Sequence, residues 1–388
     1  MDEGKYRYWP FINYIFLALA GVLLRWMQLY GLSGFNYQNL LHAHSHFAFS
    51  GWVFLSLLIL LSKAVTNEKL SASVKPMVAL TLICSFGMLV SFSVQGYKLV
   101  SILFSTLFIA VTYWFSWWFL RKSSYKEKLN PLSVKLIRAA IGYLCLSSIG
   151  PFALGPLMAN GFRDTPVYQN AIYFYLHFQM NGWMLLAVLG IVAQHHVDFD
   201  FKKKNTFNTW LAIFIYSPVP LYVLFTLWSG PSVWVFVMAF ITAILNLLSW
   251  LKLCFYFKDS FRKKSLLINA AVLAITVKGF FQLLICFPAI GEWTFSNRNL
   301  IIGYIHLLTL GCISPVLIQQ LVKNYIPGIR LKFAYIAMVL VYLMLLFLQP
   351  LLALFSIGIP QYPHFLLCVS VLLMFIGGMF LLKTRRRF

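Results

Sequence analysis

The chain has 388 residues, of which 61% are hydrophobic and only 10% are charged. A soluble domain of this length cannot bury so much apolar surface, so the composition excludes a soluble protein and indicates a polytopic membrane protein. The formal net charge of +22 is of a size that nucleic-acid-binding proteins carry, but the distribution of the basic residues argues against that class.

About twelve segments are apolar over the roughly 20 residues that a helix needs to cross a bilayer. The first has no small-residue cleavage site after it, so we interpret it as a retained helix and not as a signal peptide. The expected fold is therefore all-α, a polytopic membrane protein with a single integral membrane domain over 1–388. In chain order, the predicted spans are 11–30, 40–62, 74–94, 99–120, 134–157, 170–195, 207–228, 231–256, 265–288, 300–323, 332–350 and 363–383.

Basic residues gather in alternate loops. They lie at both termini and after the second, fourth, sixth, eighth and tenth predicted spans, whereas loops such as 31–39 and 349–360 are nearly uncharged. This positive-inside pattern predicts a multi-pass protein of the cytoplasmic (inner) membrane with both termini in the cytoplasm. The lipid bilayer is thus the expected partner, with attraction to anionic headgroups as a secondary effect, and no nucleic acid is expected.

The first predicted span carries Arg25 about five residues below its outer end. A charge at that depth is costly unless its side chain reaches the interface or meets a partner. Two interpretations follow: an arginine that snorkels to the interface, and a counter-charge to an anionic cofactor near the outer face.

The second span opens with a cluster of histidines, His42-Ala43-His44-Ser45-His46. At 100° per residue, His42 and His46 lie on one face of a helix and His44 lies on nearly the opposite face. The sixth and tenth spans carry one histidine each, His177 and His306.

His46, His177 and His306 are spaced by about 130 residues, and this period nearly exhausts the chain in three units. We therefore predict three pseudo-repeated groups of four spans, roughly 1–130, 131–260 and 261–388. Each matched histidine is followed five residues later by a glycine, which leaves room for a flat ring or for a close helix. These glycines are Gly51, Gly182 and Gly311.

Among the remaining polar residues, we interpret one as a functional candidate and the others as structural or peripheral. Lys278 lies near the middle of the ninth span, where a lysine either loses its proton or finds an anion, so it is a functional candidate. His195-His196 reads as a loop pair and His364 as an interfacial residue. The six cysteines have no paired spacing and read as small core hydrophobes.

One histidine in a span often serves only as a hydrogen-bonding residue between helices. Three at matched depth favour a ligand role, because neutral imidazole is a good ligand for iron, copper and zinc. None of the nine acidic residues lies in a predicted span, which disfavours magnesium, calcium and a carboxylate proton relay. The residues leave open a heme or copper protein, a three-histidine copper or zinc centre, a transporter or permease with a histidine-lined, proton-coupled pocket, and a structural or assembly partner of a respiratory complex.

Twelve helices in three groups of four, with histidines on the second, sixth and tenth, resemble subunit I of the heme-copper oxidase superfamily. The sequence is more similar in its motifs to the NnrS family of heme- and copper-associated membrane proteins linked to nitric oxide stress. A His-Ala-His helix opening and a later His-x-x-Thr-x-Gly are typical of that family. The corresponding residues here are His42-Ala43-His44 and His306-Leu307-Leu308-Thr309-Leu310-Gly311.

The chain departs from the oxidases at three places. His177 is followed by Phe-Gln-Met-Asn where the oxidases carry a His-Pro-Glu-Val-Tyr type motif. The seventh span lacks the His-His pair that holds copper in the oxidases, and the tenth carries His306 alone in place of His-x-His. An oxidoreductase remains possible, but oxygen reduction with proton pumping is not expected.

The resemblance implies a b-type heme, with copper as a second cofactor, and a role in nitric oxide or respiratory redox handling. It implies that His46 and His306 are the axial ligands of the heme, that His42 orients a ligand or binds a second metal, and that Arg25 or Arg298 pairs with the heme propionates. It leaves His44 and His177 as ligands of a further metal. A redox partner or another membrane subunit would supply the electrons.

Overall fold

A computed structural model describes residues 6, 8–66, 72–122, 124–196, 205–257, 265–322 and 328–385. The regular structure of these residues is helical, without a strand. Within them, twelve helices are long and apolar enough to cross a membrane. Their bounds are Tyr8–Tyr30, Tyr37–Val65, Lys75–Gln95, Leu99–Arg121, Pro131–Ala159, Pro166–His195, Asn205–Ser229, Val233–Tyr256, Leu266–Leu284, Arg298–Leu321, Ile329–Ala353 and Tyr362–Lys383.

The predicted all-α, multi-pass membrane fold is confirmed, and each predicted span overlaps one of these twelve helices. The orientation of the spans stays a prediction. Several basic runs on which it depends, at 202–204, 258–264 and 386–387, lie outside the described residues.

The chain forms two compact units, which are described separately. Unit 1 comprises 1–128 and 317–388, and unit 2 comprises 129–316. The boundary at 128/129 lies close to the first predicted repeat boundary. The other boundary falls inside the tenth span, so the spans of the third predicted repeat are divided between the two units.

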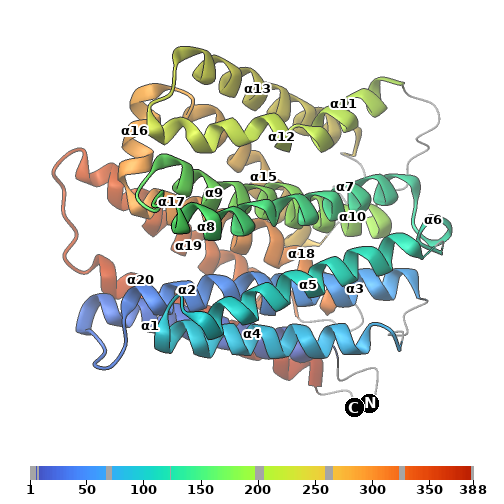
Figure 1. Cartoon of the computed structure of the whole chain (residues 1–388), viewed down its shortest axis with the longest axis horizontal. Helices are drawn as coiled ribbons and strands as arrows, with labels where there is room; N and C mark the ends of the chain where they lie inside the picture. Colours follow the sequence, from blue (N-terminus) through green and yellow to red (C-terminus); the bar gives the residue numbers. More distant parts are fainter. Residues whose placement is uncertain are drawn as a thin grey trace. The chain divides into compact units, whose positions relative to one another are not determined.

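In unit 1, α1 packs along α20 and α2 packs along α4 (Figure 1). The second span is the most enclosed of the spans that lie wholly in this unit, with 83% of its most apolar window buried against 28–44% for the others. The elements of unit 1 are α1 (Tyr8–Tyr30), α2 (Tyr37–Phe47), η2 (Ala48–Phe54), α3 (Leu55–Val65), α4 (Lys75–Gln95), α5 (Leu99–Arg121), α6 (Ser124–Lys128), α19 (Ile329–Ala353) and α20 (Tyr362–Arg385).

In unit 2, α7 packs on α10 and α15 packs on η6. The sixth span is again the most enclosed, with 89% of its window buried. The elements are α7 (Pro131–Ser147), α8 (Ile149–Ala159), α9 (Pro166–His177), η3 (Phe178–Met184), α10 (Leu185–His196), α11 (Asn205–Tyr216), α12 (Pro218–Leu221), η5 (Tyr222–Ser229), α13 (Val233–Tyr256), α15 (Leu266–Leu284), α16 (Pro288–Ser296), α17 (Arg298–His306) and η6 (Leu307–Ile313). The helix that follows, α18 (Ser314–Leu321), begins in unit 2 and crosses the boundary.

The start of the histidine-bearing helix α2 is fixed by local chemistry. The loop before it turns at Gly31 and Gly34, whose φ angles of 70° and 81° favour glycine. The side chain of Asn36 then accepts hydrogen bonds from the backbone N–H groups of Gln38 and Asn39, at 2.8 and 3.1 Å. These bonds pair two of the donors that a helix N-terminus leaves open, so α2 begins about one turn before the first histidine.

Candidate functional site

A π-helical segment follows each of the three matched histidines, directly after His177 and His306 and two residues after His46. The segments are seven residues long and lie at Ala48–Phe54, Phe178–Met184 and Leu307–Ile313, within the second, sixth and tenth spans. No other described span contains such a segment. Extended π-helical stretches are rare and occur frequently at functional sites, so the backbone marks the same three places as the histidine spacing.

In unit 1 the wide turn of η2 is supported by a buried amide. Asn13 of α1 is fully buried, and its Nδ2 donates to the backbone carbonyl of Gly51 at 2.8 Å. A π turn disturbs the i→i−4 ladder of the helix, and a buried carbonyl that loses its partner is costly unless a side chain replaces it. A Cβ on Gly51 would lie 3.1 Å from this Nδ2, so a side chain at position 51 would crowd the contact.

His42 and His46 lie together beside Tyr97 in unit 1. Nε2 of His46 is 3.0 Å from the Tyr97 hydroxyl, and the His46 ring stacks on Phe92, with centroids 4.4 Å apart and planes at 8°. The ring of His42 meets Tyr97 edge-on, with centroids 4.7 Å apart. The phenol of Tyr97 thus lies against the predicted common face of His42 and His46.

Tyr97 lies in the short connection between α4 and α5 and is 55% exposed. Gly96 before it has φ +65°, and a Cβ there would stand 2.5 Å from Oδ1 of Asn39, so only glycine fits this turn. Sequence reasoning missed Tyr97. The available signal was a glycine followed by a tyrosine at the outer end of the predicted third span.

His44 faces the other way, as the helical spacing predicts. Its Cε1 is 3.4 Å from the place where a Cβ on Gly21 of α1 would stand, and its ring hydrogen-bonds the backbone of Leu17. The remaining nitrogen, Nδ1, is buried without a partner. The predicted metal ligand His44 therefore packs against α1, on the side of the helix away from His42 and His46.

Arg25 is buried in unit 1, with 6% of its surface exposed. Its Nη2 donates to the Tyr342 hydroxyl on α19 at 2.8 Å, and its Nη1 donates to Oε1 of Gln28 at 3.1 Å. The side chain thus points into the unit and is held there by two hydrogen bonds. Gln28 and Tyr342 are both neutral, and Arg25 lies within electrostatic range of His44.

His177 is buried in unit 2, at 1% exposure, and both of its ring nitrogens are engaged. Nε2 donates to the carbonyl of Pro218 at 2.7 Å, and Nδ1 accepts from Nδ2 of Asn181 at 3.4 Å. Asn181 Oδ1 accepts in turn from the Tyr304 hydroxyl at 3.4 Å, and Tyr304 accepts from Nε2 of Gln282 at 2.9 Å. The predicted metal ligand His177 belongs to a hydrogen-bond network that joins four spans.

Lys278 lies at the edge of this network, one turn before Gln282 on α15, and is 2% exposed. It interacts electrostatically with His177 and with Cys312 of η6. No acidic residue of the chain lies in any of the twelve spans, so no carboxylate within a span neutralises this amine. Oε1 of Gln282 is buried without a partner close by.

His306 has a defined tautomer. Its Nδ1 is 2.8 Å from the carbonyl oxygen of Ile302, one turn earlier in α17. Because a carbonyl can only accept, Nδ1 carries the proton and the lone pair lies on Nε2. Metal-ligating histidines are commonly oriented by such a bond from the other ring nitrogen.

The other histidines remain peripheral. His195 is exposed at the end of α10, and the side chain of His196 lies outside the described part of the chain. His364 is exposed at the start of α20, with its ring 6.2 Å from that of Tyr30. The loop interpretation of His195-His196 is wrong, because both residues lie in the last turn of α10, and the interfacial interpretation of His364 stays a prediction.

Within the described residues, no three histidine, cysteine, aspartate or glutamate side chains come together in a group that could hold a metal ion. His42, His44 and His46 belong to unit 1, whereas His177 and His306 belong to unit 2. The assignment of His46 and His306 as a pair of axial ligands therefore stays a prediction.

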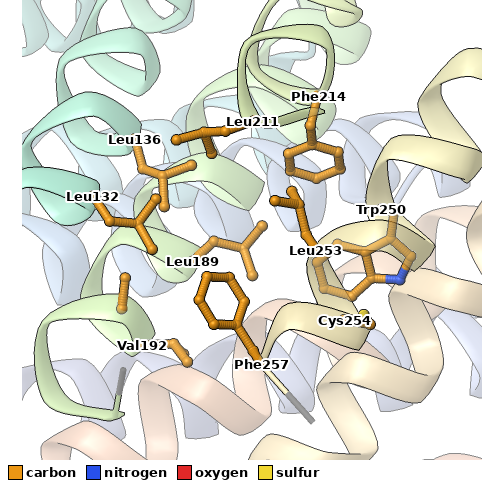
Figure 2. Close-up of a pocket in the computed structure, with 11 residues that line it drawn as sticks. Leu132, Leu136, Leu189, Val192, Leu211, Phe214, Trp250, Leu253, Cys254 and Phe257 are labelled. Carbon is orange, nitrogen blue, oxygen red and sulfur yellow. The ribbon is translucent and has the colours of Figure 1, made fainter. Parts of the chain in front are cut away.

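A cavity in unit 2 has a different character. It is lined by apolar side chains of α7, α10, α11 and α13, among them Leu136, Leu189, Phe214 and Trp250 (Figure 2). Leu189 lies twelve residues after His177 on the same span, about 18 Å along a helix. The cavity is therefore separate from the histidines, and none of the described residues that line it is charged.

No protein-family profile matches the chain, and no curated protein is similar enough to count as a match.

Proposed function

We propose that this multi-pass membrane protein binds heme, copper or both through its intramembrane histidines and serves in nitric oxide or respiratory redox handling. The observation that carries the proposal is the coincidence of histidine and π-helix at three matched places. Ionisable and metal-ligating side chains are expensive inside a membrane and mark functional sites there. The NnrS-like motifs around His42 and His306 support the choice of heme and copper.

His306 would hold the heme iron as an axial ligand. The bond from its Nδ1 to Ile302 orients the ring and leaves the lone pair on Nε2. A bound heme supplies an iron that carries one electron and binds small gases. His177 does not fit the same role, because the Pro218 carbonyl and Asn181 occupy both of its nitrogens.

The proposal includes the cytoplasmic membrane as the location, with both termini in the cytoplasm. Its support is the alternation of basic and nearly uncharged loops in the sequence. Electrons would come from a separate redox partner or membrane subunit.

The test is the absorption spectrum and the metal content of the purified full-length protein. The wild type should show a Soret band, and His306→Ala should lose it, because the substitution removes an axial ligand. The matched control is His364→Ala, which alters an exposed histidine on α20 and should keep the band. A wild-type protein with neither heme nor copper would falsify the proposal.

A transporter with a histidine-lined pocket is the second candidate, and the network in unit 2 favours it. His177, Asn181, Gln282 and Lys278 are each at most 2% exposed, and they join several spans through polar contacts. A buried amine without a carboxylate suits the passage of an anion or a proton. This candidate gains if the purified protein contains no cofactor and Lys278→Met abolishes uptake of a labelled anion.

A further inference from the structure

The strongest unassigned feature of the molecule is the cluster of His42, His46 and Tyr97 in unit 1. We propose that these three side chains form a copper(II) site with two imidazole nitrogens and one phenolate oxygen. The inference rests on the proposed function, in the part that assigns copper binding to the protein. It adds the ligands and the oxidation state of the copper. It assigns His46 to copper, whereas the resemblance assigns it to heme.

Helical spacing supplies the first two ligands. His42 and His46 are one helical turn apart on the same face of α2, the i, i+4 spacing with which paired histidines on a helix chelate a metal ion. Stacking on the fully buried Phe92 fixes the plane of the His46 ring. The order already present in α2 reduces the entropy that ligand positioning would cost.

The third ligand comes from the contact between His46 and Tyr97. Nε2 of His46 and Oη of Tyr97 lie 3.0 Å apart, at hydrogen-bonding distance. With metal–ligand bonds of about 2.0–2.1 Å, two atoms at this separation subtend roughly a right angle at the metal, whereas a tetrahedral site would place them about 3.4 Å apart. Near-right angles and N,O ligands are typical of tetragonal copper(II), so the geometry favours copper(II) over zinc.

Metal binding at this place is an exchange of a metal ion for a proton. The Tyr97 hydroxyl loses its proton to solvent, both imidazoles bind in their neutral form, and no electron is transferred. Tyr97 lies in the connection between two spans and is 55% exposed, so the protein itself does not block an ion from reaching it, and water would complete the coordination. Gly96 permits the turn that holds the phenol over the two rings.

The experiment uses the full-length protein in detergent, stripped of metal with a chelator and titrated with copper(II). Bound copper is counted, electron paramagnetic resonance reports nitrogen ligands, and visible absorption reports a phenolate-to-copper charge-transfer band. Tyr97→Phe removes the oxygen and keeps the ring, so the fold should survive. Loss of an outer-shell partner of a metal site weakens binding by roughly 10–100-fold, and loss of a direct ligand should cost at least as much.

We expect Tyr97→Phe to weaken copper binding at least about tenfold and to abolish the charge-transfer band, with His42→Ala weakening it at least about tenfold as well. The controls Tyr216→Phe and His364→Ala alter exposed residues elsewhere and should bind copper like the wild type. A charge-transfer band that persists in Tyr97→Phe overturns the site, and so does copper binding that is weakened by none of Tyr97→Phe, His42→Ala and His46→Ala.

His46→Ala separates this inference from the proposed function. Loss of copper with retention of the Soret band supports the copper site. Loss of heme with unchanged copper binding assigns His46 to heme, which overturns the copper site and leaves the proposed function standing. If the wild type binds neither copper nor heme, both proposals fail together.

Discussion

The second span of unit 1 and the sixth span of unit 2 share one backbone device and differ in its chemistry. In both, a histidine introduces a seven-residue π-helical segment with a glycine inside it. His46 meets an exposed phenol through a single ring nitrogen, whereas both nitrogens of His177 are bound within the buried core.

The contrast teaches that equal position in a repeat does not imply equal function. A proton between an imidazole and a phenol can be exchanged for a metal ion, because both atoms become ligands when the proton leaves. The carbonyl partner of His177 cannot lose a proton in this way, and exchange would leave it unpaired in a buried place. We therefore interpret the first histidine span as a binding element and the second as a structural or proton-handling element.

The glycines give the largest expected effect. A Cβ on Gly182 would stand 2.6 Å from Cβ of Tyr143 on α7, whereas the closest contact at Gly51 is 3.1 Å. Gly182→Leu should therefore prevent accumulation of folded protein, and Gly182→Ala should destabilise it by about 1–3 kcal/mol, more than Gly51→Ala. Unfolding in mild detergent measures the difference.

Gly142→Ala is the matched control, because a Cβ at this helical position in α7 meets nothing within 4 Å. Equal stability of Gly182→Ala and Gly142→Ala would mean that α7 and η3 do not approach as closely as the contact at Gly182 indicates.

Substitution of His177 should have the next largest effect and should act on stability. His177→Ala leaves the Pro218 carbonyl and the Asn181 amide without a partner in the core, at about 1–3 kcal/mol for each buried group. Heme and copper content per folded chain should not change. Loss of either cofactor in this variant would break the distinction between the two spans.

Much of the fold could be predicted from the sequence, because the length of an apolar segment and the basic residues of a loop are local signals. It also placed His42 and His46 on one face of a helix, which needs only the 100° step. The π-helical segments could not be predicted in the same way, because one wide turn leaves the pattern of apolar residues in such a hydrophobic span almost unchanged. The only sign of the altered backbone in the sequence was the glycine five residues after each of the three histidines.

The contacts of the histidines were beyond sequence reasoning because they join separate spans. Tyr97 reaches His46 from the loop after the third span, and Pro218 reaches His177 from the seventh. Nothing in the local sequence of a histidine indicates which carbonyl or phenol will face it. Lys278 was predicted as a candidate from its depth alone, and its neighbours required the structure.

The smallest expected effect concerns the support of η2. Asn13→Ala removes the 2.8 Å bond to the Gly51 carbonyl, but it also removes Oδ1 of Asn13, which is buried without a partner. The two changes partly offset one another, so the loss of stability should be about 1 kcal/mol. Asn13→Asp should cost more when its carboxyl group is ionised, because a carboxylate only accepts hydrogen bonds and places a charge among apolar side chains, whereas the protonated acid could donate to the carbonyl through its O–H. Thermal unfolding in detergent compares the two. If Asn13→Asp with an ionised carboxyl group is as stable as Asn13→Ala, the amide does not donate to Gly51, and the π turn of unit 1 is held by packing alone.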